Sequence, residues 1–517
     1  MFGYQIAIQA ARTPDVVAVT FGARSYTYAL LEQRARRLAN GLTALGVGQG
    51  DRVGILAHNC NQFIETLIAS AMLGAAFVPF NFRLVAREIA LQFDACTPKV
   101  LLAGDGFADL LEGLRERPSY PAHLLRVDDQ PPASVDSGAD HPYEAWLAGQ
   151  PAHEPAVVVA PESVQMLLHS SGTTGLPKGI VFTHAGTFAS CCAKIIDLRL
   201  TRHDATVVFG ALYHAGPLLD LTLPLLLCGG RLVLGPSRQF DPLLLLQTIA
   251  EHRGSVIPIY PTMLRRVVAL PHFGGLDLSC LRLIVTGGEP VPVPVVRAVR
   301  ERLAHVDFVN TYGSTEGGPI TTFLAAEDAL SKIGSVGKAS FGVQVRIGDA
   351  AGFERAPGEV GELLVRGPFV CRGYWNRPEE TAASLRNGWW HTGDLAYRDD
   401  DGYIWISGRS KDMIKSGTMN IYPIELEQVI AGIEGVIEVG VIGVPDEEWG
   451  ESVAAYVVKA PGSSLDSGQV IEHCRENLAS YKKPRYVVFV DSLPRGTTNK
   501  VAKDKLRAQW SADNAAH

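Results

Sequence analysis

The first part of the chain alternates between helical and extended patterns of apolar residues. Apolar positions recur at helical spacing between Thr27 and Gly46, where a glycine ends the pattern. The apolar run 52–57 that follows predicts a short buried strand, and residues 61–73 and 75–80 predict a second helix and a second strand. Because helix and strand alternate, the pattern favours a mainly parallel sheet covered on both faces, and therefore an α/β fold.

The pattern changes twice further along the chain. Residues 128–163 are rich in Pro, Ala, Asp and His and have little periodicity, which predicts a surface excursion with at most one short helix. The alternation of helix and strand resumes after residue 165. Residues 357–410 then carry short strands and turns, which predict a β-rich subdomain that ends at Arg409.

The last hundred residues predict a compact α/β unit. The pattern indicates a helix at 423–432, strands at 436–443 and 453–459, a helix near 467–479, a strand at 486–490 and a final basic helix. We therefore expect a large N-terminal domain, residues 1–410, made of layered α/β subdomains and the β-rich subdomain. A small C-terminal α/β domain, residues 411–517, completes the chain.

Composition narrows the class of protein. A chain of 517 residues with 47% hydrophobic and 20% charged residues fits a folded protein of more than one domain. The net charge of -7 gives no support for a nucleic-acid binder. The eight cysteines include no C-x-x-C pair, which argues against a zinc site and a disulfide framework. Without a signal peptide or a membrane-length apolar run, we expect a soluble cytoplasmic protein and leave its oligomeric state, a homodimer included, open.

The segment LLHSSGTTGLPKG, residues 167–179, places a turn rich in Ser, Thr and Gly directly after an apolar strand. Such a turn offers successive backbone N–H groups and hydroxyls to an anion. It is not a P-loop, because Gly172 and Gly175 are too close together and Lys178 precedes a glycine in place of Ser or Thr. An ordinary polar loop would explain the serines and glycines but not the whole combination, so we predict a phosphate-binding loop of another nucleotide family.

With this segment, the sequence resembles the adenylate-forming superfamily of acyl- and aryl-CoA ligases, peptide-synthetase adenylation domains and firefly luciferase. The resemblance extends from the helix at Thr27 to the basic terminus. Five further motifs follow in the order that the family has them: TGGEP at 286–290, NTYGSTEGG at 310–318, HTGDL at 391–395, GRSKDMIKSG at 408–417 and PRGTTNKVAK at 494–503. Chance does not supply that order.

The resemblance implies a set of nucleotide-binding residues. Tyr312 is expected to stack on adenine, Thr315 to meet the phosphate, and Glu316, with Thr315, to hold Mg²⁺, a hard cation that prefers oxygen ligands. Asp394 and Arg409 match the pair that grips the ribose hydroxyls. The other residues implied in binding ATP are Ser170, Ser171, Gly172, Thr173, Thr174, Gly175, Gly288 and Glu289.

Three lysines match family positions with distinct roles. Lys500 matches the C-terminal catalytic lysine, expected to bridge the attacking carboxylate and the α-phosphate of ATP. Lys178 of the phosphate loop is the second expected catalytic cation. Lys411 matches the hinge about which the small, mobile domain changes orientation. On composition alone each could be an exposed lysine, and Asn499 replaces the glycine that most members have before the catalytic lysine.

The acceptor of the acyl group is expected to be coenzyme A. The tail segments resemble CoA ligases at Trp449, Tyr481, Lys483 and Arg485, two aromatic rings and two cations suited to an adenine and a ribose phosphate. Gly417 is expected to line the pantetheine tunnel, where Thr418 follows in place of the usual second glycine. A solvated basic cluster is the competing interpretation.

The resemblance also implies the pocket for the acid. His214 matches a histidine that packs beside the substrate, although a lone histidine near apolar residues is more often structural. Small residues around it suggest a pocket for a bulky or ring-containing acid: Ala215, Gly216, Gly287, Gly313, Gly317 and Gly318. The expected reaction is acid:CoA ligation with ATP, Mg²⁺ and CoA. Loading of a carrier-protein thiol, or thioesterification of a supplied acyl-AMP alone, is the alternative.

Overall fold

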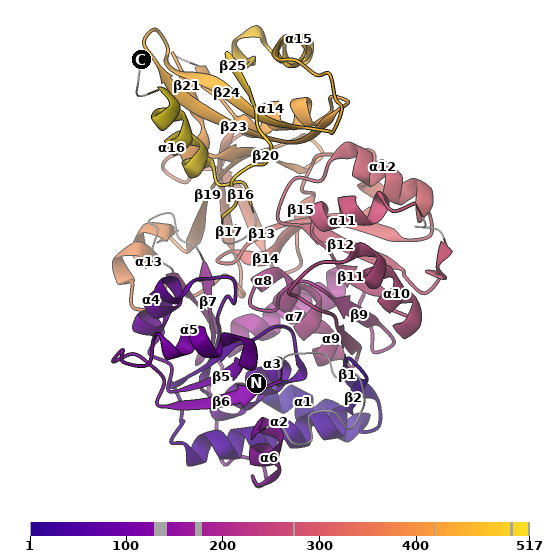
Figure 1. The fold of residues 1–517 in the computed structure, drawn as a ribbon, viewed down its shortest axis with the longest axis vertical. Coiled ribbons are helices and arrows are strands. Elements are labelled where there is room, and N and C mark those ends of the chain that lie inside the picture. Colours follow the sequence, from indigo (N-terminus) through magenta and orange to yellow (C-terminus); the bar gives the residue numbers. More distant parts are fainter. Residues whose placement is uncertain are drawn as a thin grey trace.

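The structure is a computed structural model that describes residues 2–128, 142–170, 178–271, 275–417, 419–496 and 500–514. Within these ranges the chain forms four β-sheets with helices packed around them (Figure 1). Two large sheets and their helices make up the lower and middle parts of the molecule in this view, and the C-terminal elements lie at the upper end.

The first sheet is built from strands of the N-terminal third and the predicted phosphate-loop region. Its strand order is β6 (His123–Val127), β5 (Val100–Gly104), β3 (Arg52–Leu56), β4 (Ala76–Pro79), β7 (Val164–Ser170) and β8 (Lys178–Thr183). Neighbours pair in parallel apart from the antiparallel β7 and β8. The predicted strands at 52–57 and 75–80 are thus confirmed as β3 and β4, and the helix between them as α3 (Asn61–Leu73).

The second sheet has the order β15 (Lys338–Ala339), β14 (Gly318–Leu324), β13 (Asp307–Ser314), β12 (Leu283–Gly287), β11 (Val256–Pro258), β9 (Ala205–Val208), β10 (Arg231–Leu234), β1 (Val17–Phe21) and β2 (Arg24–Thr27). Its central strands are parallel. The strands β1 and β2 form an N-terminal hairpin that the apolar pattern did not predict. It joins the sheet by pairing Val19 with Leu232, a contact between distant parts of the chain.

The main core lies between these two sheets. It collects the apolar faces of α1 (Phe2–Arg12), α2 (Tyr28–Ala44), α3, α7 (His184–Asp197) and α9 (Leu223–Cys228). Helix α2 begins where the Thr27 side chain accepts a hydrogen bond from the Leu30 backbone N–H, 3.2 Å. Tyr28 is fully buried and its hydroxyl donates to the Gly230 carbonyl, 2.7 Å, so its polar end is satisfied inside the core.

Further helices cover the outer faces of the two large sheets. They are α4 (Ala86–Cys96), α5 (Ala108–Glu112), α10 (Pro242–His252), α11 (Pro261–Val268) and α12 (Val293–Arg302), whereas α6 (Pro142–Ala148) packs on α2 and adds Tyr143 and Leu147 to the main core. In the described part of the surface excursion, residues 142–163, α6 is the one short helix, as the pattern predicted. No helix in the described ranges is both long enough and apolar enough to cross a membrane.

The third sheet is the β-rich subdomain. It contains β16 (Gln344–Gly348), β17 (Gly361–Arg366), β19 (Trp389–Arg398), β18 (Leu385–Arg386) and β20 (Ile404–Arg409), all paired antiparallel. It starts earlier than the predicted residue 357 and ends at Arg409 as predicted. The short helix α13 (Pro378–Ser384) lies between β17 and β18 in the sequence.

The fourth sheet contains β22 (Met419–Ile421), β21 (Ile414–Ser416), β24 (Gly450–Lys459), β23 (Val436–Asp446) and β25 (Tyr486–Phe489). Its helices are α14 (Pro423–Ala431), α15 (Ser467–Asn477) and α16 (Lys503–Asn514). Each predicted element of the tail is found within a few residues. The chain enters this sheet from the third one through the turn η5 (Ser410–Asp412), and Figure 1 shows the two sheets next to each other.

Candidate active site

Asp394 is a buried carboxylate at the centre of a polar cluster with the half-buried Tyr312 and the exposed Arg409. It lies on β19 opposite Arg409 of β20, and the Arg409 Nε is 2.9 Å from its Oδ1. The hydroxyl of Tyr312, at the end of β13, donates to its Oδ2 at 2.5 Å. Burial, and next the Asp394 carboxylate, raise the pKa of Tyr312, which therefore stays protonated. Three residues predicted from separate motifs thus meet in one place.

Glu316 lies in the turn between β13 and β14, beside two residues that the sequence did not identify. Its Oε1 accepts a hydrogen bond from the Tyr374 hydroxyl, 3.3 Å. Lys178, at the start of β8, lies over the Tyr374 ring with its Nζ 4.8 Å from the centroid, and it forms an ion pair with Glu380 of α13. Burial raises the pKa of Glu316, while its own backbone, Tyr374 and the nearby cations oppose the shift.

Lys500 lies near these groups although it comes from the C-terminal part of the chain. Its side chain is exposed, yet it stands in a crowded region, and this burial by surrounding protein, followed by the cation of Arg409, lowers its pKa. The carboxylates of Asp394 and Glu289 oppose the shift. The lysine is therefore within electrostatic range of both the Asp394 cluster and the end of β12.

His214 connects Lys500 to the expected acid pocket. It precedes the short helix α8 (Ala215–Pro217), and its ring lies 4.2 Å from that of Tyr213. Burial lowers the pKa of His214 to about 3, with smaller effects from the cations of Arg83 and Lys500. It is therefore a neutral imidazole at physiological pH. A buried, neutral His214 is better suited to forming a wall of the pocket than to donating a proton.

Glu289 and Gly288 lie where β12 ends. The Glu289 Oε1 accepts from the Thr262 backbone N–H, 2.7 Å, and so caps the first turn of α11. Gly288 has φ +84°, and a Cβ placed there would lie 3.5 Å from the Tyr260 Cε1. A side chain at this position would require a strained backbone and would contact the Tyr260 ring, which therefore borders Gly288.

The glycines expected to enlarge the acid pocket differ in their surroundings. A Cβ at Gly287 would lie 2.3 Å from the Thr311 carbonyl oxygen, and one at Gly313 would lie 2.3 Å from the Gly318 carbonyl oxygen. Close approach of β12, β13 and β14 accounts for both glycines, so their lack of a side chain does not measure pocket volume. At Gly317 the nearest atom is the Ser314 Oγ, at 3.1 Å. Whether the acid touches these positions stays a prediction.

The phosphate loop is described only at its two ends. Ser170 of β7 pairs with Lys178 of β8. Five loop residues predicted to bind phosphate lie outside the described residues: Ser171, Gly172, Thr173, Thr174 and Gly175. Thr418 and Asn499 lie outside them as well.

Asp446 organises part of the expected CoA surface, and the sequence did not identify it. Its Oδ1 accepts from the Trp449 backbone N–H, 3.0 Å, and it forms an ion pair with Arg485. Gly417 has φ +59°, and its N–H donates to the Trp449 carbonyl, 2.7 Å. The Trp449 side chain is 48% exposed, which leaves its ring free to stack on a ligand.

Tyr481 and Lys483 are separate from that group. Tyr481 is 46% exposed, and Lys483 donates to the Ser480 carbonyl at 3.2 Å. No interaction recorded among the described residues joins either of them to Trp449 or to the Asp394 cluster. The structure thus brings together three of the five residues expected to bind CoA.

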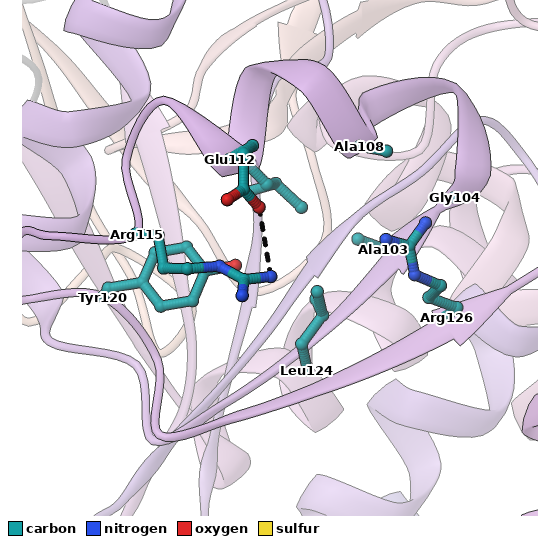
Figure 2. Close-up of a pocket in the computed structure, with 9 residues that line it drawn as sticks. Ala103, Gly104, Ala108, Glu112, Arg115, Tyr120, Leu124 and Arg126 are labelled. Carbon is teal, nitrogen blue, oxygen red and sulfur yellow. Dashed lines mark ion pairs between the residues drawn. The ribbon is translucent and has the colours of Figure 1, made fainter.

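A pocket on the first sheet lies apart from all of these groups. It is lined by residues of β5, α5, β6 and the segment between α5 and β6. Two of the lining residues, Glu112 and Arg115, form an ion pair, 3.1 Å (Figure 2). None of its lining residues was predicted as a site residue. The candidate active site is therefore defined by converging side chains and not by this pocket.

The cluster of Tyr312, Asp394 and Arg409, the Glu316 carboxylate and Lys500 are groups whose chemistry suits a nucleotide. The comparisons with known proteins agree. Residues 6–375 match the model of the AMP-binding enzyme family, and residues 425–500 match the model of the AMP-binding enzyme C-terminal domain.

Curated relatives narrow the class further. The chain is 38% identical to feruloyl-CoA synthase from an Amycolatopsis species, over 97% of each chain. It is 38% identical to indoleacetate–CoA ligase from Aromatoleum aromaticum, over 96% of this chain and 95% of that protein. Among solved structures, the anthranilate CoA ligase AuaEII in complex with anthranoyl-AMP has a TM-score of 0.90 at 27% identity, over 98% and 96% of the two chains. The chain therefore belongs to the adenylate-forming superfamily, in its acyl-CoA ligase branch.

Proposed function

We propose that this chain is an AMP-forming acid:CoA ligase that acts in two steps. The carboxylate of the acid attacks the α-phosphate of ATP, which gives acyl-AMP and pyrophosphate. The thiol of CoA then attacks the acyl carbon, and AMP leaves. The observation that carries the proposal is the position of Lys500, which reaches from the C-terminal part of the chain to Asp394, Arg409 and Glu289.

In the first step, Lys500 is placed to stabilise developing charge. A lysine within range of both His214 and the Asp394 cluster lies between the expected acid pocket and the expected ribose site. Its ammonium would bridge the attacking carboxylate and the α-phosphate, where negative charge gathers in the transition state. Because burial and the cation of Arg409 lower the pKa of Lys500, its ammonium loses its proton at a lower pH than an ordinary surface lysine does.

Asp394 and Arg409 fit the ribose. The Asp394 oxygens already accept from Tyr312 and Arg409, but a carboxylate has about four acceptor positions, so two remain for vicinal hydroxyls. The same hydrogen bond fixes the Tyr312 ring, which supports its proposed role against adenine.

Glu316 and Thr315 fit a magnesium ion bound with the nucleotide. Glu316 provides a buried carboxylate with one hydrogen-bond donor at Oε1, and it has capacity for a further ligand. Mg²⁺ commonly takes one or two carboxylates and completes its shell with water and substrate phosphates, so a larger cluster of ligands is not required. When bound, the ion would neutralise phosphate charge. Lys178 would leave its ion pair with Glu380 and bind the phosphates of ATP.

The second step requires another orientation of residues 411–517. In the present orientation Lys500 faces the nucleotide site, and Arg265 Nη1 of α11 donates to the Ile437 carbonyl of β23, 2.7 Å. We propose that this contact breaks as the chain turns at Lys411, and that the Trp449 surface then receives CoA.

The ring-containing acids named for the relatives support a ring-containing acid here. Ferulate, indoleacetate and anthranilate each contain an aromatic ring. The Tyr260 ring beside Gly288 offers an aromatic surface against which such a ring could pack. Carrier-protein loading remains the second candidate, but the exposed Trp449 and the cation of Arg485 favour a free nucleotide-bearing thiol.

The test is product analysis with a panel of acids. The chain is incubated with ATP, Mg²⁺, CoA and each acid, and acyl-CoA, AMP and pyrophosphate are measured by mass spectrometry. We expect acyl-CoA and AMP in equal amounts. Acyl transfer to a phosphopantetheinyl protein with none to CoA would favour the carrier-protein alternative. Thioester formation from supplied acyl-AMP, without pyrophosphate exchange, would indicate a half-reaction enzyme.

A further inference from the structure

Asp220 is a carboxylate inside an apolar run. It lies in η2 (Leu218–Thr222), a π-helical turn that continues α8, and the leucines beside it are buried. Its Oδ1 is buried and has no hydrogen-bond partner among the described residues. A buried acceptor without a partner destabilises the fold, because it has lost its hydrogen bonds to water. Such a group needs a functional explanation.

Lys194 of α7 is the cation that interacts electrostatically with Asp220, but its ammonium group makes its close contacts with other residues. It is fully buried, its Nζ donates to the Ser190 Oγ at 2.9 Å, and the same nitrogen lies 4.3 Å from the Phe369 ring centroid. No ion pair within 4 Å joins it to Asp220 in the described residues. Burial raises the pKa of Asp220 to about 7, opposed by Lys194. The lysine thus favours the charged carboxylate without occupying its oxygens.

Asp220 faces the expected acid pocket through Gly216. A Cβ at Gly216, four residues earlier, would lie 3.4 Å from the Asp220 Oδ2 and 3.5 Å from the Tyr260 Oη. The Tyr260 ring also borders Gly288, which adjoins Glu289 and, through it, Lys500. Tyr260 therefore extends from the region of the reacting carboxylate towards Asp220. A hydroxyl of Tyr213, also buried and without a partner among the described residues, interacts with Tyr260.

We propose that Asp220, Tyr260 and Gly216 form the far end of the acyl pocket, and that the acid ligated by this chain carries a hydroxyl group that hydrogen-bonds to Asp220. This inference rests on the proposed function and specifies the acid. A hydroxyl can donate to the carboxylate and accept from a tyrosine at once. It would satisfy acceptor capacity that the protein leaves open.

The surrounding charges favour a neutral donor over an ammonium group. Lys194 interacts with Asp220, and Arg83 interacts with Tyr213, His214 and Tyr260. A second cation on the substrate would meet both of these positive charges. An acid without a polar group would leave Oδ1 desolvated and unpaired, and buried polar sites reject such analogues strongly.

The test compares hydroxylated acids with the same acids lacking the hydroxyl. Three pairs vary the distance from carboxylate to hydroxyl: 4-hydroxybenzoate and benzoate, 4-hydroxycinnamate and cinnamate, and 3-(4-hydroxyphenyl)propanoate and 3-phenylpropanoate. We expect the wild type to prefer the hydroxylated member of at least one pair by about 10- to 100-fold in kcat/KM, the worth of a hydrogen bond to a charged group. Asp220→Ala should remove this preference by lowering kcat/KM for the hydroxylated acid and raising it for the other acid, which no longer buries an unpaired carboxylate oxygen.

Asp197→Asn is the matched control. Asp197 also interacts with Lys194 from α7, but it accepts from Ser340, away from the pocket, so its substitution should preserve the preference. If Asp220→Ala fails to fold, Asp220→Asn, which keeps the shape, should still reduce the preference. The inference is wrong if no pair shows a preference, or if Asp220→Ala lowers both acids equally. If no acid in any panel is ligated, the proposed function itself fails.

Discussion

Lys500→Met removes the one cation that the C-terminal part of the chain is proposed to bring to the reacting groups. The side chain keeps its length and apolar stem but loses its charge. Lys500 interacts electrostatically with Asp394, Glu289 and Arg409, which supports its proposed place beside the α-phosphate. Removal of one preorganised charge-stabilising donor typically lowers kcat by 10²–10³, about 2.7–4 kcal/mol of transition-state stabilisation.

The two half-reactions separate this effect from damage to the fold. Acid-dependent exchange of pyrophosphate into ATP reports the first step, and thioester formation from synthetic acyl-AMP and CoA reports the second. We expect Lys500→Met to lower exchange by 10²–10³ and to leave thioester formation within about threefold. Lys505→Met is the control, because Lys505 lies in the same tail and, among the described residues, donates to the Arg495 carbonyl, 3.3 Å, and not to a group of the proposed site. Equal loss in both half-reactions would refute the assigned role.

The pH dependence of the first step follows from the same geometry. The protonated form of Lys500 is the active one, and its pKa is lowered by burial and by Arg409. The exchange rate should therefore be full below this lowered pKa and should decline as the pH rises through it, earlier than for an ordinary lysine. In Lys500→Met this alkaline decline should disappear. A decline that persists in the variant would have to come from another group.

Three further predictions test other parts of the molecule. Asp446→Asn should raise KM for CoA about tenfold, because it weakens the contacts that hold Trp449 and Arg485, and it should leave pyrophosphate exchange unchanged. An unchanged KM would contradict the proposed CoA surface. Arg34→Met strands the fully buried Glu65 carboxylate and should lower the free energy of unfolding by about 3–5 kcal/mol in urea titrations, whereas a change under 1 kcal/mol would contradict the buried network. Arg265→Ala removes the donor to the Ile437 carbonyl and should slow adenylation two- to tenfold but not thioester formation. Equal slowing of both steps would contradict a role of this contact in setting the orientation of residues 411–517.

The sequence predicts the local elements of this fold well and the long-range pairings poorly. Helix α3 and the elements of the tail follow from apolar periodicity, which depends on nearby residues. The N-terminal hairpin joins the second sheet by pairing Val19 with Leu232, and no local pattern specifies a partner so far along the chain. Pairing of this kind depends on the whole packed core.

The site divides in the same way. The ordered motifs assigned Tyr312, Asp394 and Arg409 to one nucleotide site, and the structure places these three residues in contact. Tyr374 and Asp446 were missed, since a single tyrosine, or a single aspartate at the end of a strand, has no distinctive spacing and its role depends on contacts made in the fold. Asp220 did leave a signal: it is a single carboxylate within the run LLDLTLPLLL.

The central claim is that this chain joins a carboxylic acid to CoA through an acyl-adenylate. The most direct test is to follow one turnover with ATP, CoA and a ring-containing acid, quenching at intervals and measuring acyl-AMP and acyl-CoA by mass spectrometry. The account predicts that acyl-AMP rises first and then falls as acyl-CoA and AMP form in equal amounts. Formation of acyl-CoA with ADP and phosphate as products, or accumulation of acyl-AMP that CoA never consumes, would contradict it.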